Sequence, residues 1–313
     1  MFKLLIASLL ALSTLSVHAF DPKKEVITVL VGFAPGGGTD TVIKPYLEKI
    51  EQLGYVTRIE YKPGAESSIA MNYFSKLPKD GKTILIAASS GLILSKVFQE
   101  DHVKNDGFDL VTTLGFGPNV LITGADNNIN TFEEFSADIK TGEQKTFAAG
   151  SLLGTVSAQY IASKLGISKD GIIIANYKGM APATQDVAGG HAKYAIVPLT
   201  VALPMLDGGK IKLLAIGGPQ RNSKYPKVPT FVEKIKGFAV ETSESNWGVV
   251  LPKNSPKEVV NFYVTLFTSV GKDKLLQEKL ANSFIFIKDS DLGPDKYNSI
   301  YKRSIDAWQE IKN

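Results

Sequence analysis

The sequence predicts an α/β protein with a wound β-sheet and more than one domain. Short apolar runs rich in β-branched residues alternate along the chain with stretches whose apolar residues recur at helical spacing. The composition, 44% hydrophobic and 21% charged, is ordinary for a globular protein. Removal of a leader of 19 residues would leave about 294 of the 313 residues (313 − 19), a length that favours two domains of ~100–200 residues.

Residues 1–19 have the pattern of a secretory signal peptide. Lys3 supplies the charged start, an apolar core runs from Leu4 to Leu15, and Val17 and Ala19 occupy the small-residue positions of a cleavage site. The core is short for a membrane span, and no later stretch approaches ~20 uninterrupted apolar residues. We therefore expect export to the periplasm of a Gram-negative bacterium.

The composition excludes several classes of function. The chain has no cysteine, which removes disulfides, thiolate metal sites, a cysteine nucleophile and a lipid anchor at the cleavage site. The formal charge of +4 is spread without a long basic run, so a nucleic-acid partner is not expected. The mature protein is expected to have no membrane anchor.

In the first half of the chain, predicted strands and helices alternate. The first helix has apolar residues at helical spacing and ends at Gly54, a typical C-terminal cap. Pro45 would kink this helix unless it lies in the first turn. The predicted strands are 25–31, 57–61, 83–88 and 119–123, and the predicted helices are 39–53, 67–75 and 131–139.

The second half repeats the scheme. A short strand at 147–149 leads through a Gly/Ser/Thr loop at 150–155 into a helix whose apolar face contains Val156, Tyr160, Ile161 and Leu165. The last third predicts a strand followed by one long amphipathic helix. The further strands are 171–175, 194–197, 213–216 and 247–251, and the long helix is 256–280.

The segment FAPGGGTD at 33–40 is the most informative motif. Three glycines at a strand-to-helix turn leave bare amides at Gly37, Gly38 and Thr39, which together with the helix dipole suit a carboxylate or a phosphate. We expect a β-carbon at Gly37 to intrude on a ligand or to strain a positive φ. The alternative is a purely structural turn. Asp40 could contact a ligand, but we favour a role in ordering the loop through amide hydrogen bonds.

The loop at 150–155 is a second helix start of the same kind. Two such loops in separate α/β units allow a cleft whose walls both offer amides and hydroxyls to one small ligand. Ser89 and Ser90 end the strand 83–88 and could reach this cleft. For Trp247, burial at a domain junction is favoured over stacking on a ligand.

Nucleotide, metal and hydrolase motifs are missing from the sequence. GxGxxG would need a glycine at Thr41, and GxxxxGK[ST] does not occur. His102 and His191 stand in unrelated contexts and are assigned to surface or packing roles. No GxSxG is present, so a secreted α/β hydrolase is possible but unsupported.

Taken together, the motifs resemble the substrate-binding proteins of tripartite tricarboxylate transporters, the Bug family of periplasmic receptors. The resemblance covers nearly the whole mature chain, and it depends on the order and spacing of several segments. These segments are FAPGGGTD at 33–40, YKPGAESS at 61–68, DGKTILIAAS at 80–89, NYKGMAPATQDVAGG at 176–190, DGGKIKLLAIGG at 207–218 and KVPTFVE at 227–233.

The resemblance implies a two-lobed type 2 periplasmic binding protein that closes on an organic acid between its lobes. Residues 20–120 and 245–313 would form the discontinuous first lobe and 121–244 the second, with crossing strands near 119–123 and 245–248. No catalytic residue, cofactor or metal is implied. The expected ligand-binding residues are Phe33, Ala34, Gly36, Gly37, Gly38, Thr39, Asp40, Ser89, Ser90, Ser151, Gly154, Thr155 and Tyr177.

The implied function is a monomeric, non-enzymatic receptor for a di- or tricarboxylate or an aromatic carboxylate. It would deliver this ligand to a membrane permease with a large and a small subunit, or alternatively signal to a two-component sensor kinase. The chain departs from the family pattern at several positions, so the ligand does not follow from the resemblance. These positions are Lys44, Gln159, Tyr160, Asn176 and Lys193.

Overall fold

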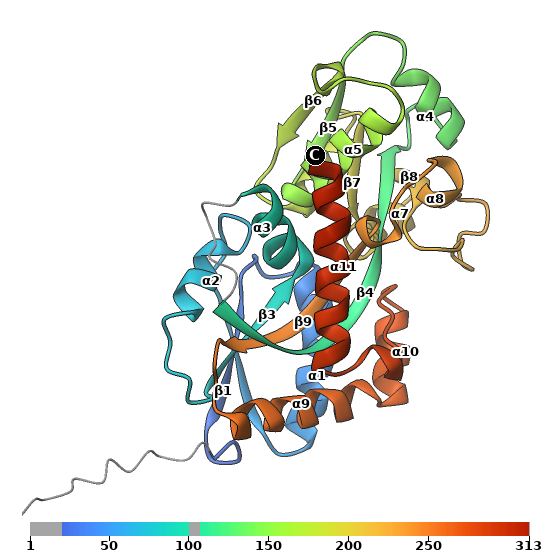
Figure 1. The fold of residues 1–313 in the computed structure, drawn as a ribbon. Helices are drawn as coiled ribbons and strands as arrows, with labels where there is room; N and C mark the ends of the chain where they lie inside the picture. The colour runs from blue at the N-terminus through green and yellow to red at the C-terminus, as the bar shows by residue number, and fades with distance from the viewer. Residues whose placement is uncertain (1–20, 100–106, 313) are drawn as a thin grey trace, which may run out of the picture.

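The computed structural model describes residues 21–99 and 107–312, which form a mixed nine-stranded sheet with helices on its faces (Figure 1). The strand order is β2-β1-β3-β9-β4-β7-β5-β6, and β8 also pairs with β4. The α/β class is therefore confirmed. The predicted signal peptide and His102 lie outside the described residues. Within the described residues, no helix is long and apolar enough to cross a membrane.

The first strand group contains β1 (Val26–Val31), β2 (Val56–Tyr61), β3 (Thr83–Ala88), β9 (Glu244–Pro252) and the first part of β4 (Phe108–Gly124). β1 is parallel to β2 and β3, whereas β9 is antiparallel to β3 and β4. Alternate side chains of β1 and β3 enter two different clusters, so both faces of this group are covered.

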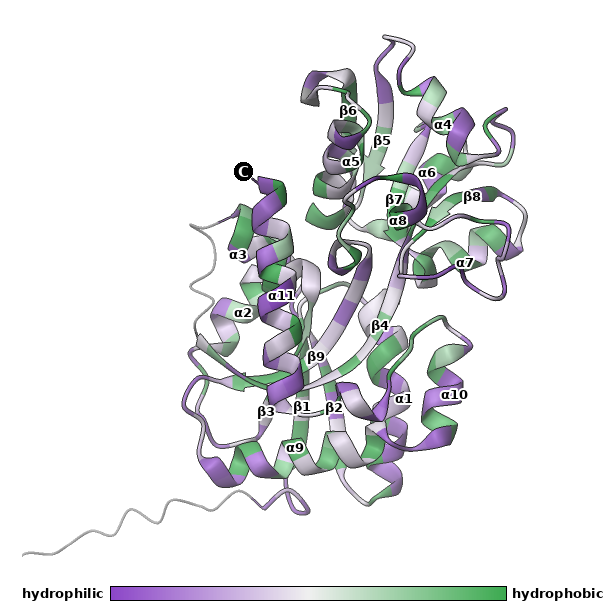
Figure 2. Cartoon of the chain, turned by 45° about the vertical axis from the view of Figure 1, so that its right-hand side comes forward, coloured by the Kyte–Doolittle hydropathy of each residue, from purple (hydrophilic) through white to green (hydrophobic). Residues whose placement is uncertain are grey.

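Helices from both ends of the chain cover the first group. On one face lie α1 (Gly38–Gln52), α9 (Lys257–Gly271) and α10 (Lys274–Ala281). The other face packs against α2 (Ser68–Phe74), the π-helix η1 (Ser90–Leu94) with α3 (Ser95–Phe98), and α11 (Pro294–Lys312). Figure 2 shows hydrophobic residues along the inner faces of these elements.

The second strand group contains β5 (Lys145–Ala149), β6 (Ile172–Asn176), β7 (Tyr194–Pro198), β8 (Ile211–Ile216) and the end of β4. α4 (Phe132–Asp138), α5 (Leu152–Lys164) and α8 (Phe231–Lys234) contribute to one hydrophobic cluster of this group. α6 (Met180–Ala188) and α7 (Leu199–Asp207) contribute to another.

β4 joins the two groups. It pairs with β9 as far as Pro118 and with β7 from Asn119 onward. The strand predicted at 119–123 was therefore too short, since β4 has 17 residues. The first part of β4 has a weak strand signal in the sequence, because it contains Gly115, Gly117 and Pro118. The ladder with β9 continues past them through register shifts, one of them between Thr113 and Gly115, where φ of Gly115 is +157°.

The remaining predicted strands agree with the structure within two or three residues at each end. The helix predicted at 256–280 was wrong as one element: it is broken after Gly271, and Asp273 begins α10 by accepting a hydrogen bond from Leu276 N at 2.8 Å. The helices α3, α6, α7, α8 and α11 were not predicted. Pro45 lies in the interior of α1, and Gly54 follows its end with φ +84°.

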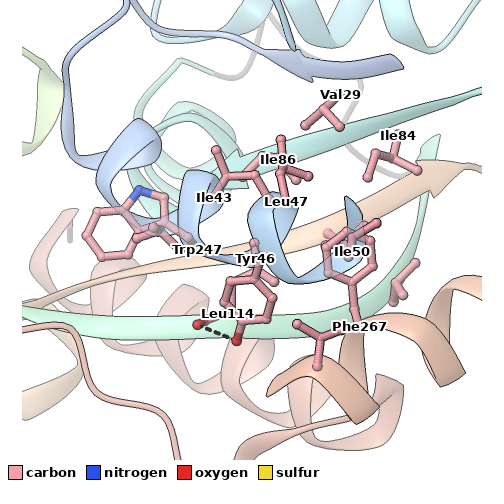
Figure 3. Close-up of a cluster of buried hydrophobic side chains, with 14 of the residues drawn as sticks. Val29, Ile43, Tyr46, Leu47, Ile50, Ile84, Ile86, Leu114, Trp247 and Phe267 are labelled. Carbon is pink, nitrogen blue, oxygen red and sulfur yellow. Dashed lines mark hydrogen bonds between the residues drawn. The ribbon is translucent and has the colours of Figure 1, made fainter. Parts of the chain in front are cut away.

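The core beneath α1 fixes the position of the first loop (Figure 3). Ile43, Tyr46, Leu47 and Ile50 are all buried on the inner face of the helix. The buried Tyr46 hydroxyl donates a hydrogen bond to the Leu114 carbonyl of β4 at 2.9 Å. α1 is thereby tied to the strand that joins the two groups.

α11 packs across both strand groups. It contacts β4 and the α3 and η1 segments of the first group, and also the short helix Val240–Thr242 before β9. Trp308 near its end shares a hydrophobic cluster with Leu153 and Val156 of α5. The N-terminus of α5 is therefore held against the first strand group (Figure 1).

Candidate functional site

The first glycine loop is ordered by Asp40. Its Oδ2 accepts a hydrogen bond from Gly36 N at 2.8 Å, and the Tyr61 hydroxyl donates to the same carboxylate at 3.0 Å. Lys44 forms an ion pair with Oδ2 at 3.0 Å. Asp40 is only 3% exposed, so its carboxylate is committed to these partners. The loop-ordering interpretation is confirmed, and Lys44, one of the departures from the family pattern, takes part in it.

The positive φ of the first loop is at Gly36 and not at Gly37, where it was expected. Gly36 has the positive φ, +82°, whereas Gly37 has an extended backbone with φ −83° and ψ −176°. A β-carbon at Gly37 would meet only the Ala34 carbonyl oxygen, at 3.6 Å. At Gly38 it would lie 3.0 Å from the Trp247 ring. The positive φ expected at Gly37 was therefore wrong, because the turn places it one residue earlier.

At the start of α1, the amides of Gly37, Gly38 and Thr39 have no acceptor among the described residues. Phe33 is half-buried and Ala34 is exposed just before them. The 15-residue helix adds the positive end of its dipole at this point. Amides without acceptors at the positive end of a helix dipole suit an anion.

The second loop has the same construction at α5. Ser151 is extended, with φ −163°, and its carbonyl accepts from Thr155 N at 3.3 Å. The amides of Leu153 and Gly154 meet no acceptor within residues 21–99 and 107–312. The backbone of Gly150 lies so close to Gly179 that a β-carbon would be 2.1 Å from the Gly179 carbonyl oxygen. This close approach requires glycine at position 150.

Glu66 joins the two groups at this point, and sequence reasoning missed it as a functional residue. Its Oε1 accepts a hydrogen bond from Leu152 N, the first amide of α5, at 2.7 Å. Its Oε2 is buried without a partner in the described residues. Burial raises the pKa of this carboxyl, and the Leu152 bond lowers it by a smaller amount. The sequence signal for it is an acidic residue inside the YKPGAESS turn.

Further polar and aromatic residues lie just after β3, in β9 and in α7. The Ser89 hydroxyl accepts a hydrogen bond from Asn246 N of β9 at 3.2 Å, and Ser90 begins the π-helix η1. Trp247 is buried beside Gly38, as the junction interpretation predicted. Thr200, which was not predicted, also faces Gly38, and its Oγ1 is buried without a partner in the described residues.

Tyr177 has a local partner. Its hydroxyl donates a hydrogen bond to Asp186, which raises the pKa of the phenol, and its amide donates to Ala149 at 2.8 Å. Both contacts lie within the second strand group. A structural role therefore accounts for Tyr177 without a ligand.

Two of the departures from the family pattern also have structural partners. Tyr160 packs on Phe238 with ring centroids 4.9 Å apart. Lys193 forms an ion pair with Asp138 at 2.7 Å. These contacts account for the Tyr160 and Lys193 side chains without a role at the two loops.

Two surface cavities lie away from these loops. One of about 260 Å³ is lined by Tyr55 and Phe262 of the first group. Another of about 550 Å³ is lined by residues around Lys145 and by His191, an exposed side chain as predicted. The donors described above come instead from the starts of α1 and α5, which belong to different strand groups.

The fold is that of solved periplasmic binding proteins. MatC from Rhodopseudomonas palustris, solved with bound malate, has a TM-score of 0.81 with 20% identity and covers 93% of this chain and 99% of its own. Rpa4515 from R. palustris, solved with adipate, has a TM-score of 0.84 with 22% identity and covers 93% of this chain and 97% of its own.

Sequence comparison defines the family. The model of the tripartite tricarboxylate transporter family receptor matches residues 46–290, well over half of the chain. The UPF0065 protein in the tcbD-tcbE intergenic region of Pseudomonas sp. (strain P51) is 26% identical over 294 residues, covering 91% of this chain and 84% of that protein. The chain belongs to the tripartite tricarboxylate transporter receptor family, and the resemblance seen in its motifs is confirmed.

Proposed function

We propose that the protein is a periplasmic receptor for a small organic acid. The observation that carries the proposal is the pair of helix starts, at α1 and α5, whose free amides come from different strand groups. Charge-assisted hydrogen bonds from backbone amides are well suited to a carboxylate. The two related folds solved with malate and adipate are consistent with this ligand class.

The two strand groups then act as lobes. Residues 20–120 and 245–313 form the first lobe and 121–244 the second, and the change of β4 partner between Pro118 and Asn119 supports the boundary. Ligand contacts from both lobes would favour the closed arrangement through their differential affinity for it. The contacts are expected from the first loop, Ser89 and Ser90, and from the second loop at Ser151, Gly154 and Thr155.

Delivery to a membrane permease with a large and a small subunit completes the proposal. Family membership supports this partner, and a receptor role without catalysis is part of it. We propose a monomer in the periplasm. Uptake of the bound acid by vesicles that contain the permease, dependent on added receptor, is the test of the partner. Uptake that is independent of the receptor would contradict it.

Ligand binding is tested first by native mass spectrometry of the purified protein and by thermal shift against malate, adipate and their monoamides. A ligand at a hundred times its dissociation constant should add about 2.7 kcal/mol of stability. If none of these acids stabilises the protein while an unrelated neutral solute does, the carboxylate proposal fails.

A further inference from the structure

The turn that carries Glu66 is held in an unusual backbone conformation. Ala65, Glu66 and Ser67 have φ values of 46°, 51° and 69°, so three consecutive residues other than glycine lie in the left-handed region. Each such residue is sterically strained, because its β-carbon comes too close to the following carbonyl oxygen. The surrounding structure must therefore impose the conformation.

Two glycines make room for this turn. A β-carbon at Gly32 would lie 1.7 Å from the Ser67 hydroxyl, and one at Gly91 would lie 2.9 Å from the Glu66 carbonyl oxygen. Gly32 is the residue before the first loop, and Gly91 follows Ser90. The turn is thus packed between two segments of the proposed ligand site. The side chain of Glu66 extends from it to α5 of the other strand group.

The Glu66 carboxylate is only half satisfied there. Oε1 binds the first amide of α5 at 2.7 Å, whereas Oε2 is buried and has neither a hydrogen bond nor an ion pair among residues 21–99 and 107–312. A buried carboxylate oxygen without a donor is costly. A group with an N–H that enters beside α5 would remove this cost.

We propose, on the basis of the receptor function above, that Glu66 determines specificity by accepting a hydrogen bond from an amide or ammonium group of the ligand. The carboxylate of the same ligand then lies at the N-terminus of α1. A second ligand carboxylate at α5 is disfavoured, because Glu66 already occupies the first amide and because two carboxylates repel each other at close range. The preferred ligand is therefore a monocarboxylate with a nitrogen donor at its far end.

The test compares ligands of equal shape. Succinate, glutarate and adipate are titrated by calorimetry against their monoamides, succinamate, glutaramate and adipamate, at pH 7.5. Wild type should bind the best monoamide at least about tenfold more tightly than the dicarboxylate of the same length, the effect of a hydrogen bond to a charged group. Glu66→Gln should abolish this preference.

Glu60→Gln is the matched control, because Glu60 pairs with Lys62 at 3.1 Å, at the end of β2. It should retain the wild-type preference. Circular dichroism checks the folding of each variant, and the comparison on wild type alone still tests the proposal if Glu66→Gln does not fold.

Three results would overturn the proposal. Tighter binding of dicarboxylates by wild type would show that Glu66 does not exclude a second carboxylate. If Glu66→Gln changes the affinity for dicarboxylates and for monoamides equally, Glu66 only connects the two strand groups. If none of the six ligands binds while an unrelated neutral solute does, the organic-acid receptor function itself fails. Binding of dicarboxylates alone leaves that function intact and removes only the role of Glu66.

Discussion

Gly37→Val separates ligand binding from folding at the first loop. The extended backbone at Gly37, with φ −83° and ψ −176°, suits a β-branched residue, and the nearest atom to a new β-carbon is 3.6 Å away. Because valine is a poor N-cap, we expect a loss of stability of no more than about 1 kcal/mol. The protein should therefore fold.

Binding should fall much further than stability. The valine side chain would stand beside the free amides of Gly37, Gly38 and Thr39, where the ligand carboxylate is proposed to lie. Each hydrogen bond from these amides to a carboxylate contributes roughly 1.5–3 kcal/mol. Losing a single bond would weaken the affinity about 10- to 150-fold.

Calorimetry with the tightest-binding acid or monoamide, together with urea denaturation, measures both effects. Gly107→Val is the matched control, because a β-carbon there meets no atom of the described residues within 4 Å and the φ of Gly107 is not positive. It should change neither quantity. An affinity for Gly37→Val within twofold of wild type would refute the amide site and leave the glycines with a structural role only.

Three further substitutions test other parts of the structure. Asp40→Ala should lower the free energy of unfolding by about 1–3 kcal/mol, because the Gly36 amide loses its acceptor, and Asp40→Asn should lower it less. If urea denaturation finds Asp40→Ala as stable as wild type, the loop-ordering role is contradicted. Tyr46→Phe should cost about 1–2 kcal/mol in the same assay, because the buried Leu114 carbonyl loses the hydrogen bond from the Tyr46 hydroxyl. An unchanged value would remove the link between α1 and β4. Burial raises the pKa of Glu66, so the folded protein favours the protonated carboxyl. The contribution of Glu66 to folding stability is therefore complete below the unfolded pKa of about 4.3 and is lost as the pH rises through the folded pKa. The stability of Glu66→Gln relative to wild type should increase from pH 4 to pH 8, and a constant difference would contradict the burial.

The sequence alone determined the local features of this protein. Most strands, the start of α1 at the last of the glycines and its end before Gly54 follow from periodic burial and from hydrogen bonds between near neighbours. The ordering of the first loop is also local, because the Asp40 carboxylate accepts from the Gly36 amide only four residues away. The two helix-start loops could therefore be identified as candidate anion sites before the fold was known.

Only the tertiary structure decided how these local features meet. Glu66 and Leu152 are 86 residues apart, and Gly38 meets Trp247 and Thr200 from distant elements, so neither contact has a local signal. The continuation of β4 through Gly115 and Pro118 likewise depends on its pairing with β9. Pairing and packing between distant segments are set by the topology of the whole chain, whereas local patterns report only the face that each segment buries.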